Sequence, residues 1–477
     1  MPPLLALLLS LGLTAWLFCR YTEKQAGVST ALWIPFAWLF FCSSRPLSVW
    51  MSIGPTSYTS AQLDGSPLDS SLFQALMIAG AVVLSKRRLD WGALFRRNNL
   101  LLIFFLYLGI TTIWSDYPFV AIKRWIKDLG NVIMVLVVVS DQNPIAAVRF
   151  LFARCCYLLL PLSVTFIKYF PALGRYYDPW NGAASYCGAT TDKNMLGMIL
   201  FVCTLSLVWM LLQPDRRRTG FKARMDFAVV LLMGAMAVWL LQQAHSSTAL
   251  SCTLLGVLIF VGARFAPIRK RLGLYGIGLG VLLMVLQLGF NLSEMLVQMV
   301  GRDPTLTGRT DIWSAVLKEG TDPLFGVGYY SFWLGDRVDR LSAKYHYYLN
   351  EAHNTYLETY LNTGLIGLGL LFAVLLSSAV WTKGEAMKCE PFGAFRLACF
   401  LSLVIYGITE AFTNRLASIW FLFLLVILRF PQKQTAQSGQ RISAGPNQDA
   451  IRRLAAPGRR ANASSSVFNR TTLRGEA

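Results

Sequence analysis

Long stretches without a charged residue constrain this 477-residue chain most strongly. Residues 194–214, 272–293 and 359–382 contain no Asp, Glu, Lys or Arg, and each is long enough for a helix to cross about 30 Å of hydrocarbon. Residues 227–263 are also uncharged, and their length predicts two spans joined by a tight turn near His245. The apolar residues do not alternate as they would in strands, and the segments lack the polar face of a soluble helix. The sequence therefore predicts helices that span a membrane.

Weaker apolar segments add further predicted spans. They lie near residues 4–19, 28–43, 70–85, 98–115, 127–140, 148–168, 394–412 and 415–429. The composition, with 55% hydrophobic and 14% charged residues, agrees with this class of protein. We expect an all-α, polytopic integral membrane protein with about 12–13 transmembrane helices.

Basic clusters indicate the orientation of these spans. Residues 86–97, 214–225 and 264–271 are rich in Lys and Arg, and the positive-inside rule places such segments in the cytoplasm. The tail from 430 to 477 is also basic and poor in apolar residues, so we expect it to be cytoplasmic and largely disordered. The basic residues are spread over membrane-flanking segments. We therefore interpret the net charge of +19 as a topology signal and expect no nucleic-acid partner.

The segments between the basic clusters then face outward, and the largest of them is 291–362. It holds six Lys and Arg against nine Asp and Glu, which agrees with an outer position. The predicted organisation is an N-terminal transmembrane bundle over 1–290, one large outer (periplasmic) loop with short helices over 291–362, C-terminal transmembrane helices over 363–429, and the basic tail.

All histidines of the chain fall on the predicted outer side; they are His245, His346 and His353. His353 lies where the large outer loop runs into a span. With Tyr356, Leu357 and Tyr360 it has the spacing of one helical stripe. An imidazole at this boundary could carry acid–base chemistry, because its ordinary pKa lies near neutrality. It could equally pack in an interfacial helix beside the tyrosines, and the spacing leaves both interpretations open.

The sequence contains no pattern typical of a metal or nucleotide site. The nine cysteines lie mostly within predicted spans, and Cys187 alone falls in an outer loop, so no disulfide framework is expected. No Cys/His cluster has zinc spacing, and there is no P-loop and no glycine-rich dinucleotide motif. We expect no metal and no cofactor.

Four motifs between residues 308 and 368 occur in an informative order. They are G-R-T-x-x-W (308–313), P-L-F-G-V-G (323–328), H-N-T-Y-L (353–357) and G-L-I-G-L (364–368). Their order and spacing resemble the O-antigen ligase / polysaccharide polymerase (Wzy-type) family. Other segments resemble bacterial exopolysaccharide polymerases of that family, namely 44–50, 64–70, 114–130, 188–197 and 409–414.

The resemblance implies an activity. Members of the family are integral-membrane glycosyltransferases, which move a glycan from a polyprenyl-diphosphate carrier to an acceptor hydroxyl on the outer side of the bacterial inner membrane. The acceptor is another repeat unit for a polymerase and a lipid A core for a ligase. The implied partners are a lipid-linked glycan donor, a glycan or lipid-linked acceptor and the lipid bilayer, with polysaccharide export machinery as a further candidate. The family uses no nucleotide sugar and is regarded as metal-independent.

The resemblance also implies roles for particular residues. The loop histidine of the family matches His353, which would act as general base on the acceptor hydroxyl. The diphosphate leaving group needs fixed cations, and Arg309, Lys193 and Arg124 are the candidates in that order. Each has an ordinary alternative: a loop salt bridge, a lysine at a helix end, and an interfacial anchor. Asn354, next to His353 in the motif, is expected to contact the substrate.

The chain departs from the family pattern at two places. Asp192 stands where many relatives have a histidine before the lysine. Residues 246–248 are Ser-Ser-Thr where many ligases have a Ser-Arg pair; His245 could replace that arginine as a donor or simply occupy the turn. Glu410 is expected to orient Arg309 or the acceptor, or to form an ion pair at a helix end. The missing arginine favours a polymerase over a ligase.

A polytopic transporter is the alternative from another class. Transporters place ionisable residues within spans near the midplane. Here the polar residues gather on the predicted outer side, which favours chemistry at the membrane surface.

Overall fold

Apolar helices make up most of the structure. The computed structural model describes the chain outside residues 52–64, 178–183, 214–219, 272–308, 346–348, 389–390, 414–415 and 431–477, and the side chains of Gln25, Arg309 and Thr310 also lie outside the description. Seven of the described helices are long and apolar enough to cross a membrane. They are α1 (Pro3–Arg20), α6 (Pro67–Lys86), α10 (Pro144–Tyr169), α12 (Lys193–Leu212), α13 (Gly220–Ala244), α19 (Thr355–Met387) and α20 (Pro391–Thr409).

Shorter elements accompany these helices. The shorter apolar ones are Thr30–Ser43, made of η1 (Thr30–Leu32) and α3 (Trp33–Ser43), then α14 (Ser247–Gly262) and α21 (Ser418–Ile427). α7 (Trp91–Arg97) and α8 (Asn99–Ile110) form a pair bent by 87°. The remaining elements are α2 (Glu23–Ala26), α4 (Leu47–Trp50), α9 (Pro118–Val139), α11 (Pro171–Gly174), α17 (Arg309–Val316), α18 (Asp336–Tyr345), and the antiparallel strands β1 (Arg175–Tyr177) and β2 (Ala184–Tyr186).

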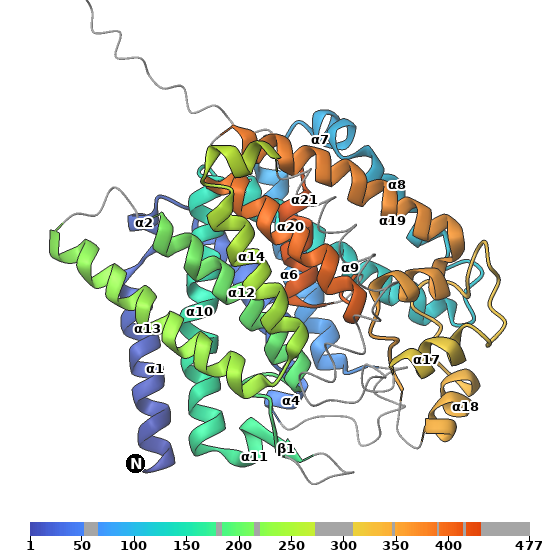
Figure 1. Ribbon diagram of the computed structural model, residues 1–477, viewed down its shortest axis with the longest axis horizontal. Helices are drawn as coiled ribbons and strands as arrows, with labels where there is room; N and C mark the ends of the chain where they lie inside the picture. Colours follow the sequence, from blue (N-terminus) through green and yellow to red (C-terminus); the bar gives the residue numbers. More distant parts are fainter. Residues whose placement is uncertain are drawn as a thin grey trace, which may run out of the picture. The chain divides into compact units, whose positions relative to one another are not determined.

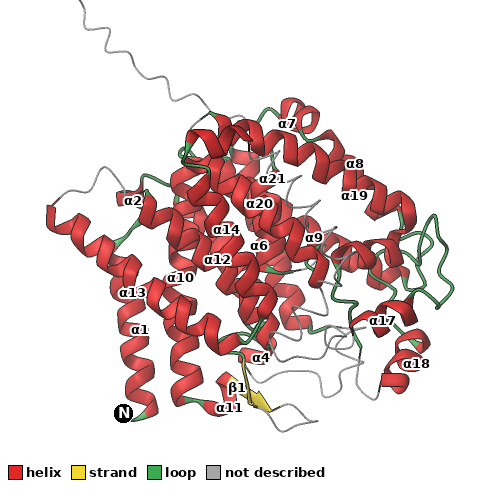
Figure 2. Ribbon diagram, in the orientation of Figure 1, coloured by secondary structure: helices red, strands yellow, loops and turns green. Residues whose placement is uncertain are grey.

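The predicted all-α, multi-pass architecture is confirmed. Every predicted span in the described residues coincides with a helix, and a turn at His245 separates α13 from α14. The span predicted over 272–293 lies outside the described residues, so the total of about 12–13 spans stays a prediction. Helices α12, α14 and α20 pack together, and α19 lies along α20 (Figure 1). The β1–β2 hairpin follows α11 (Figure 2).

Segment 323–328 packs against a break inside α19. Gly364 leaves the helical conformation with φ 65° and ψ −167°, a region that is essentially restricted to glycine. The N–H of Leu365 donates to the carbonyl of Pro323 at 2.8 Å. A Cβ at position 364 would lie 2.1 Å from the carbonyl oxygen of Leu324. The G-L-I-G-L and P-L-F-G-V-G motifs therefore pack against each other through Gly364.

Gly364→Ala should destabilise the fold by roughly 2–4 kcal/mol, because the added Cβ adds backbone strain and forces segment 323–328 away. Gly369→Ala is the matched control: it changes a glycine of the same helix with nothing within 4 Å of the added Cβ. Thermal unfolding of the purified variants measures the difference. Equal melting temperatures would contradict the close packing.

Asp128, a buried carboxylate in α9, fixes residues 329–330, which directly follow segment 323–328. Asp128 is 1% exposed and accepts hydrogen bonds from Trp420 Nε1 of α21 at 2.5 Å and from the Tyr329 hydroxyl at 3.1 Å. Arg124, one turn earlier in α9, donates to the carbonyl of Tyr330 at 2.6 Å. Hydrogen bonds are electrostatically strong in such a buried setting. Helix α9, through Asp128 and Arg124, therefore holds residues 329–330 in a defined position, and Trp420 of α21 holds Asp128.

Candidate active site at His353

His353 lies just outside its helix. The side chain of Asn354 caps α19 by accepting the N–H groups of Tyr356 and Leu357 at 2.9 and 3.0 Å. His353 has a φ of 50°, in the left-handed region that is uncommon for residues with a Cβ. The predicted helical stripe is therefore wrong for His353, because the helix starts at Thr355 behind its asparagine cap. The substrate contact predicted for Asn354 stays a prediction.

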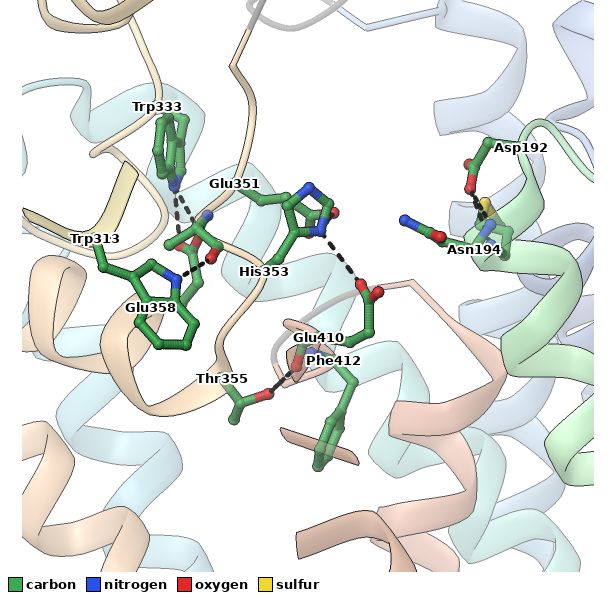
Figure 3. Close-up of polar contacts among 12 residues, drawn as sticks. Asp192, Asn194, Trp313, Trp333, Glu351, His353, Thr355, Glu358, Glu410 and Phe412 are labelled. Carbon is green, nitrogen blue, oxygen red and sulfur yellow. Dashed lines mark hydrogen bonds and ion pairs between the residues drawn. The ribbon is translucent and has the colours of Figure 1, made fainter. Parts of the chain in front are cut away.

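Both backbone groups of Ala352 are anchored, which fixes the residue before His353. The N–H of Ala352 donates to Glu358 Oε1 at 2.5 Å, and its carbonyl accepts a hydrogen bond from Trp313 Nε1 at 2.7 Å. Glu358 also accepts the indole N–H of Trp333 at 2.8 Å (Figure 3). These anchors can hold the left-handed backbone of His353, which costs on the order of 1–3 kcal/mol.

Two carboxylates contact one ring nitrogen of His353. Its Nδ1 lies 2.9 Å from Glu351 Oε1 and 3.2 Å from Glu410 Oε2 (Figure 3). The imidazole side chain is 25% exposed, whereas that of Glu410 is 2% exposed. Among the described residues, the polar contacts of the ring all involve Nδ1. Glu351 and Glu410 therefore hold the ring from one side, and no described residue makes a polar contact with Nε2.

Thr355 holds Glu410 in place. Its hydroxyl donates to the backbone carbonyl of Glu410 at 2.9 Å and accepts the N–H of Phe412 at 3.1 Å (Figure 3). Thr355 is 2% exposed. The chain that leaves α20 is thus fastened to the first turn of α19, which brings Glu410 to His353.

The carboxylates raise the pKa of His353 to about 9. Burial lowers this pKa, since a buried imidazolium loses its hydration, but the hydrogen bonds and negative charges of Glu351 and Glu410 outweigh burial. The ring is therefore mostly protonated at neutral pH. Because the pKa in the fold exceeds the ordinary value of 6.5, the ion pairs stabilise the fold fully below about pH 6.5. That contribution is lost as the pH rises through about 9.

The same three side chains have the chemistry of metal ligands. Glu351, His353 and Glu410 each offer one ligand atom, and these atoms lie within 4.8 Å of one another. A metal would need the neutral imidazole, because a protonated ring nitrogen cannot ligate. At neutral pH the cluster is instead held together by its own opposite charges.

The start of α12 faces this cluster (Figure 3). Asp192 caps α12 by accepting the N–H groups of Asn194 and Met195, both at 2.9 Å. Burial raises the pKa of Asp192, and the negative charge of Glu351 raises it further, which puts the two carboxylates within electrostatic range. Lys193, the first residue of α12, is partly buried. This predicted diphosphate ligand therefore comes from an element that faces His353.

For the other predicted site residues, the structure gives no contact with His353 among the described residues. Arg124 lies over the ring of Tyr330, with its guanidinium carbon 5.1 Å from the ring centroid. His245 occupies the turn after α13 with a φ of 47°, and its ring centroid is 6.5 Å from that of Tyr186. Arg309 begins α17, and its side chain lies outside the described residues. The structure joins Glu410 to His353 and leaves the roles of Arg124, His245 and Arg309 as predictions.

Sequence reasoning does not identify Glu351 or Thr355 as parts of the site. Glu351 lies two residues before His353 in the same loop. An acid so close to a candidate base could have indicated that the two side chains interact. Thr355 acts on Glu410 across 55 positions of the chain, and no local pattern reveals such a contact. Glu410 itself is predicted, but its observed partner is His353.

Comparisons with known proteins find a family model that matches part of the chain. Residues 228–372 match the family model described as O-Antigen ligase. This confirms the resemblance found in the sequence, and the matched residues include Glu351, His353 and Thr355.

Two curated proteins are similar to the chain. One is "Exopolysaccharide production protein ExoQ" of Rhizobium meliloti (strain 1021), which is 26% identical over 303 residues covering 58% of this chain and 63% of that protein. The other is "Putative polysaccharide ligase" of Rickettsia bellii (strain RML369-C), which is 27% identical over 217 residues covering 43% of this chain and 53% of that protein. The similarity therefore spans less than two thirds of either relative.

Proposed function

We propose that this protein is a membrane glycosyltransferase that polymerises polyprenyl-diphosphate-linked oligosaccharide repeat units into an exopolysaccharide or another surface polysaccharide. The observation that carries the proposal is the His353 cluster. An imidazole flanked by two carboxylates, with no polar contact from a described residue on its second nitrogen, stands at the start of a helix long and apolar enough to span a membrane. It also lies within the residues that match the ligase family model. The names of both relatives, which refer to polysaccharides, support the same class of substrate.

The proposed reaction transfers the donor glycan from the lipid diphosphate to a hydroxyl of the acceptor sugar. The hydroxyl oxygen of the acceptor attacks the anomeric carbon of the donor sugar, and the bond from that carbon to the diphosphate oxygen breaks. Polyprenyl diphosphate leaves with the bonding electron pair. His353 takes the hydroxyl proton on Nε2, and Glu351 and Glu410 stabilise the imidazolium that forms.

Fixed cations stabilise the departing diphosphate in this proposal. Arg309 is the first candidate, followed by Lys193 and Arg124. Lys193 is supported by its place at the start of α12, which faces the cluster (Figure 3). Asn354 and His245 are proposed as further substrate contacts.

The proposed location is the bacterial inner membrane, with the His353 cluster on the periplasmic side. The lipid-linked donor and a glycan or lipid-linked acceptor would reach the cluster from that side. Polysaccharide export machinery is a proposed partner. The basis is the predicted topology, in which the basic segments 86–97 and 264–271 lie in the cytoplasm.

A ligase that transfers the same donor glycan to a lipid A core is the second candidate, and the name of the Rickettsia relative favours it. Deletion of the gene followed by analysis of surface glycans separates the two. Loss of high-molecular-weight exopolysaccharide with intact lipopolysaccharide is the expected result for the polymerase. A complete lipid A core without its O-chain would support the ligase, and unchanged glycans of both kinds would refute both.

Thr355→Val should reduce turnover about tenfold, because the isosteric side chain cannot hold the backbone beside Glu410. Thr355→Ser keeps the hydroxyl and should retain most of the activity. Turnover of a lipid-linked glycan by the purified variants measures the effect. Equal losses in the Val and Ser variants would show that the hydroxyl is not what matters.

Removal of divalent metals should leave the activity unchanged, since at neutral pH the ring of His353 is mostly protonated and a protonated nitrogen cannot bind a metal. The measurement is turnover after dialysis against EDTA, with and without added Mn²⁺ or Zn²⁺. A loss that is restored by one metal would instead identify Glu351, His353 and Glu410 as its ligands.

A further inference from the structure

A pocket lies at the opposite end of the helices from His353. α12 starts at the His353 cluster and runs for 20 residues, which is about 30 Å of helix. Its last turn, at Met210 and Leu211, lines a half-open pocket of about 70 Å³. Helices α1, α10 and α13 form the other walls, and α1 and α13 both pack against α10 (Figure 1). The pocket is therefore separate from the candidate active site.

The pocket combines apolar walls with a charged rim. Ala153 and Tyr157 of α10 form a buried floor, and Leu17 of α1 is 1% exposed. Phe227 of α13 lines the pocket and is 55% exposed, so the pocket continues onto the outward surface of α13. This surface belongs to a helix apolar enough to cross a membrane, and such a helix would present it to lipid chains.

The rim carries an excess of positive charge. Arg20 and Asp226 form an ion pair at 2.9 Å. Arg149 also lines the pocket, and among the described residues its guanidinium donates to the carbonyl of Gln213 and has no carboxylate partner. A guanidinium has five N–H donors, and its remaining groups suit a phosphate. Among the described residues that line the pocket, two arginines and one aspartate thus leave one positive charge at its edge.

We propose that this pocket binds an anionic phospholipid. Its phosphate contacts Arg149 and Arg20, and an acyl chain lies against Leu17 and Phe227. Basic pockets between transmembrane helices are typical sites for anionic headgroups. A free phosphate ion gains nothing from the apolar walls, and a zwitterionic lipid gains little from the excess charge. The bound lipid bridges α1 and α13, and so stabilises this end of the helical bundle.

The test uses the full-length protein purified in a neutral detergent. Added phosphatidylglycerol should raise the melting temperature by roughly several degrees through preferential binding to the folded state, and native mass spectrometry should show a retained lipid. Phosphatidylcholine and soluble glycerol phosphate should produce no comparable shift. The phosphatidylglycerol shift should shrink at high salt, because screening weakens the phosphate contact.

Substitutions of charged residues test whether the rim of the pocket causes the shift in melting temperature. Arg149→Gln should abolish the phosphatidylglycerol shift. Arg264→Gln, which changes an exposed arginine just after α14 outside the pocket, should retain it. Asp226→Asn removes the acid from the rim and should keep or enlarge the shift, so the proposal stays testable if Arg149→Gln fails to fold. An equal shift with phosphatidylcholine or glycerol phosphate, or a full shift in Arg149→Gln, overturns the proposal.

Discussion

His353→Asn should reduce glycan transfer by roughly 10²–10⁴-fold while the protein remains folded in the membrane. That range is the contribution expected of a general base, and the amide of asparagine cannot accept the acceptor proton at neutral pH. Asparagine is the best replacement for a structural reason. It tolerates the left-handed backbone at this position better than most residues with a Cβ.

The readout is turnover of a lipid-linked glycan by purified variants, alongside their melting temperatures. His353→Ala should show a similar loss of activity, with a lower melting temperature if the left-handed backbone is harder to hold. The general-base assignment would be refuted by a His353→Asn variant that keeps activity within a few-fold of the parent. A variant that fails to reach the membrane would be replaced by His353→Gln for the same comparison.

Glu410→Gln should shift the pH dependence of transfer toward lower pH. In the parent protein the pKa of His353 is raised to about 9, so the neutral ring that can accept a proton makes up roughly one part in a hundred at pH 7. Transfer should therefore rise about tenfold per pH unit below pH 8 and level off near pH 9. Glu410→Gln removes one of the two negative charges on Nδ1, which lowers the pKa of His353 and moves this rise to lower pH.

Glu351→Gln should produce a shift in the same direction, because Glu351 contacts the same nitrogen. The measurement is the pH–rate profile of the purified parent and of both variants between pH 5.5 and about 9.5, the range in which the ring titrates. A parent profile that instead falls as the pH rises through about 9 would assign a different role to His353. The imidazolium would then stabilise the diphosphate, and a carboxylate would take the proton.

The transmembrane architecture can be predicted because its physical cause is local. A charge-free run such as 194–214 is stable only away from water, in hydrocarbon or among other apolar helices, and the structure forms α12 there. The tight turn near His245 is likewise fixed by the length of one uncharged stretch. The broken helix α19 is different, since a sequence rich in Leu and Gly reads as one continuous span. Its break depends on Gly364 meeting segment 323–328, which is distant in sequence.

The candidate site can be predicted only in part for the same reason. His353 stands out because histidines are rare in the chain and because its H-N-T-Y-L motif resembles a family motif. The helical stripe fails because the Asn354 cap is a stronger local preference than apolar spacing. The pairing of His353 with Glu410 requires the contact between the ends of α19 and α20, which Thr355 secures. Such contacts depend on tertiary packing and leave no periodic trace in one sequence.

Reconstitution of the purified protein with a polyprenyl-diphosphate-linked oligosaccharide tests the central claim most directly. The products are separated by size, and released polyprenyl diphosphate is quantified for the parent and for His353→Asn. The proposal predicts a ladder of longer glycans and one released lipid diphosphate per transfer in the parent, and neither in the variant. A parent protein that leaves the lipid-linked donor intact, with or without a lipid A core as acceptor, would contradict it.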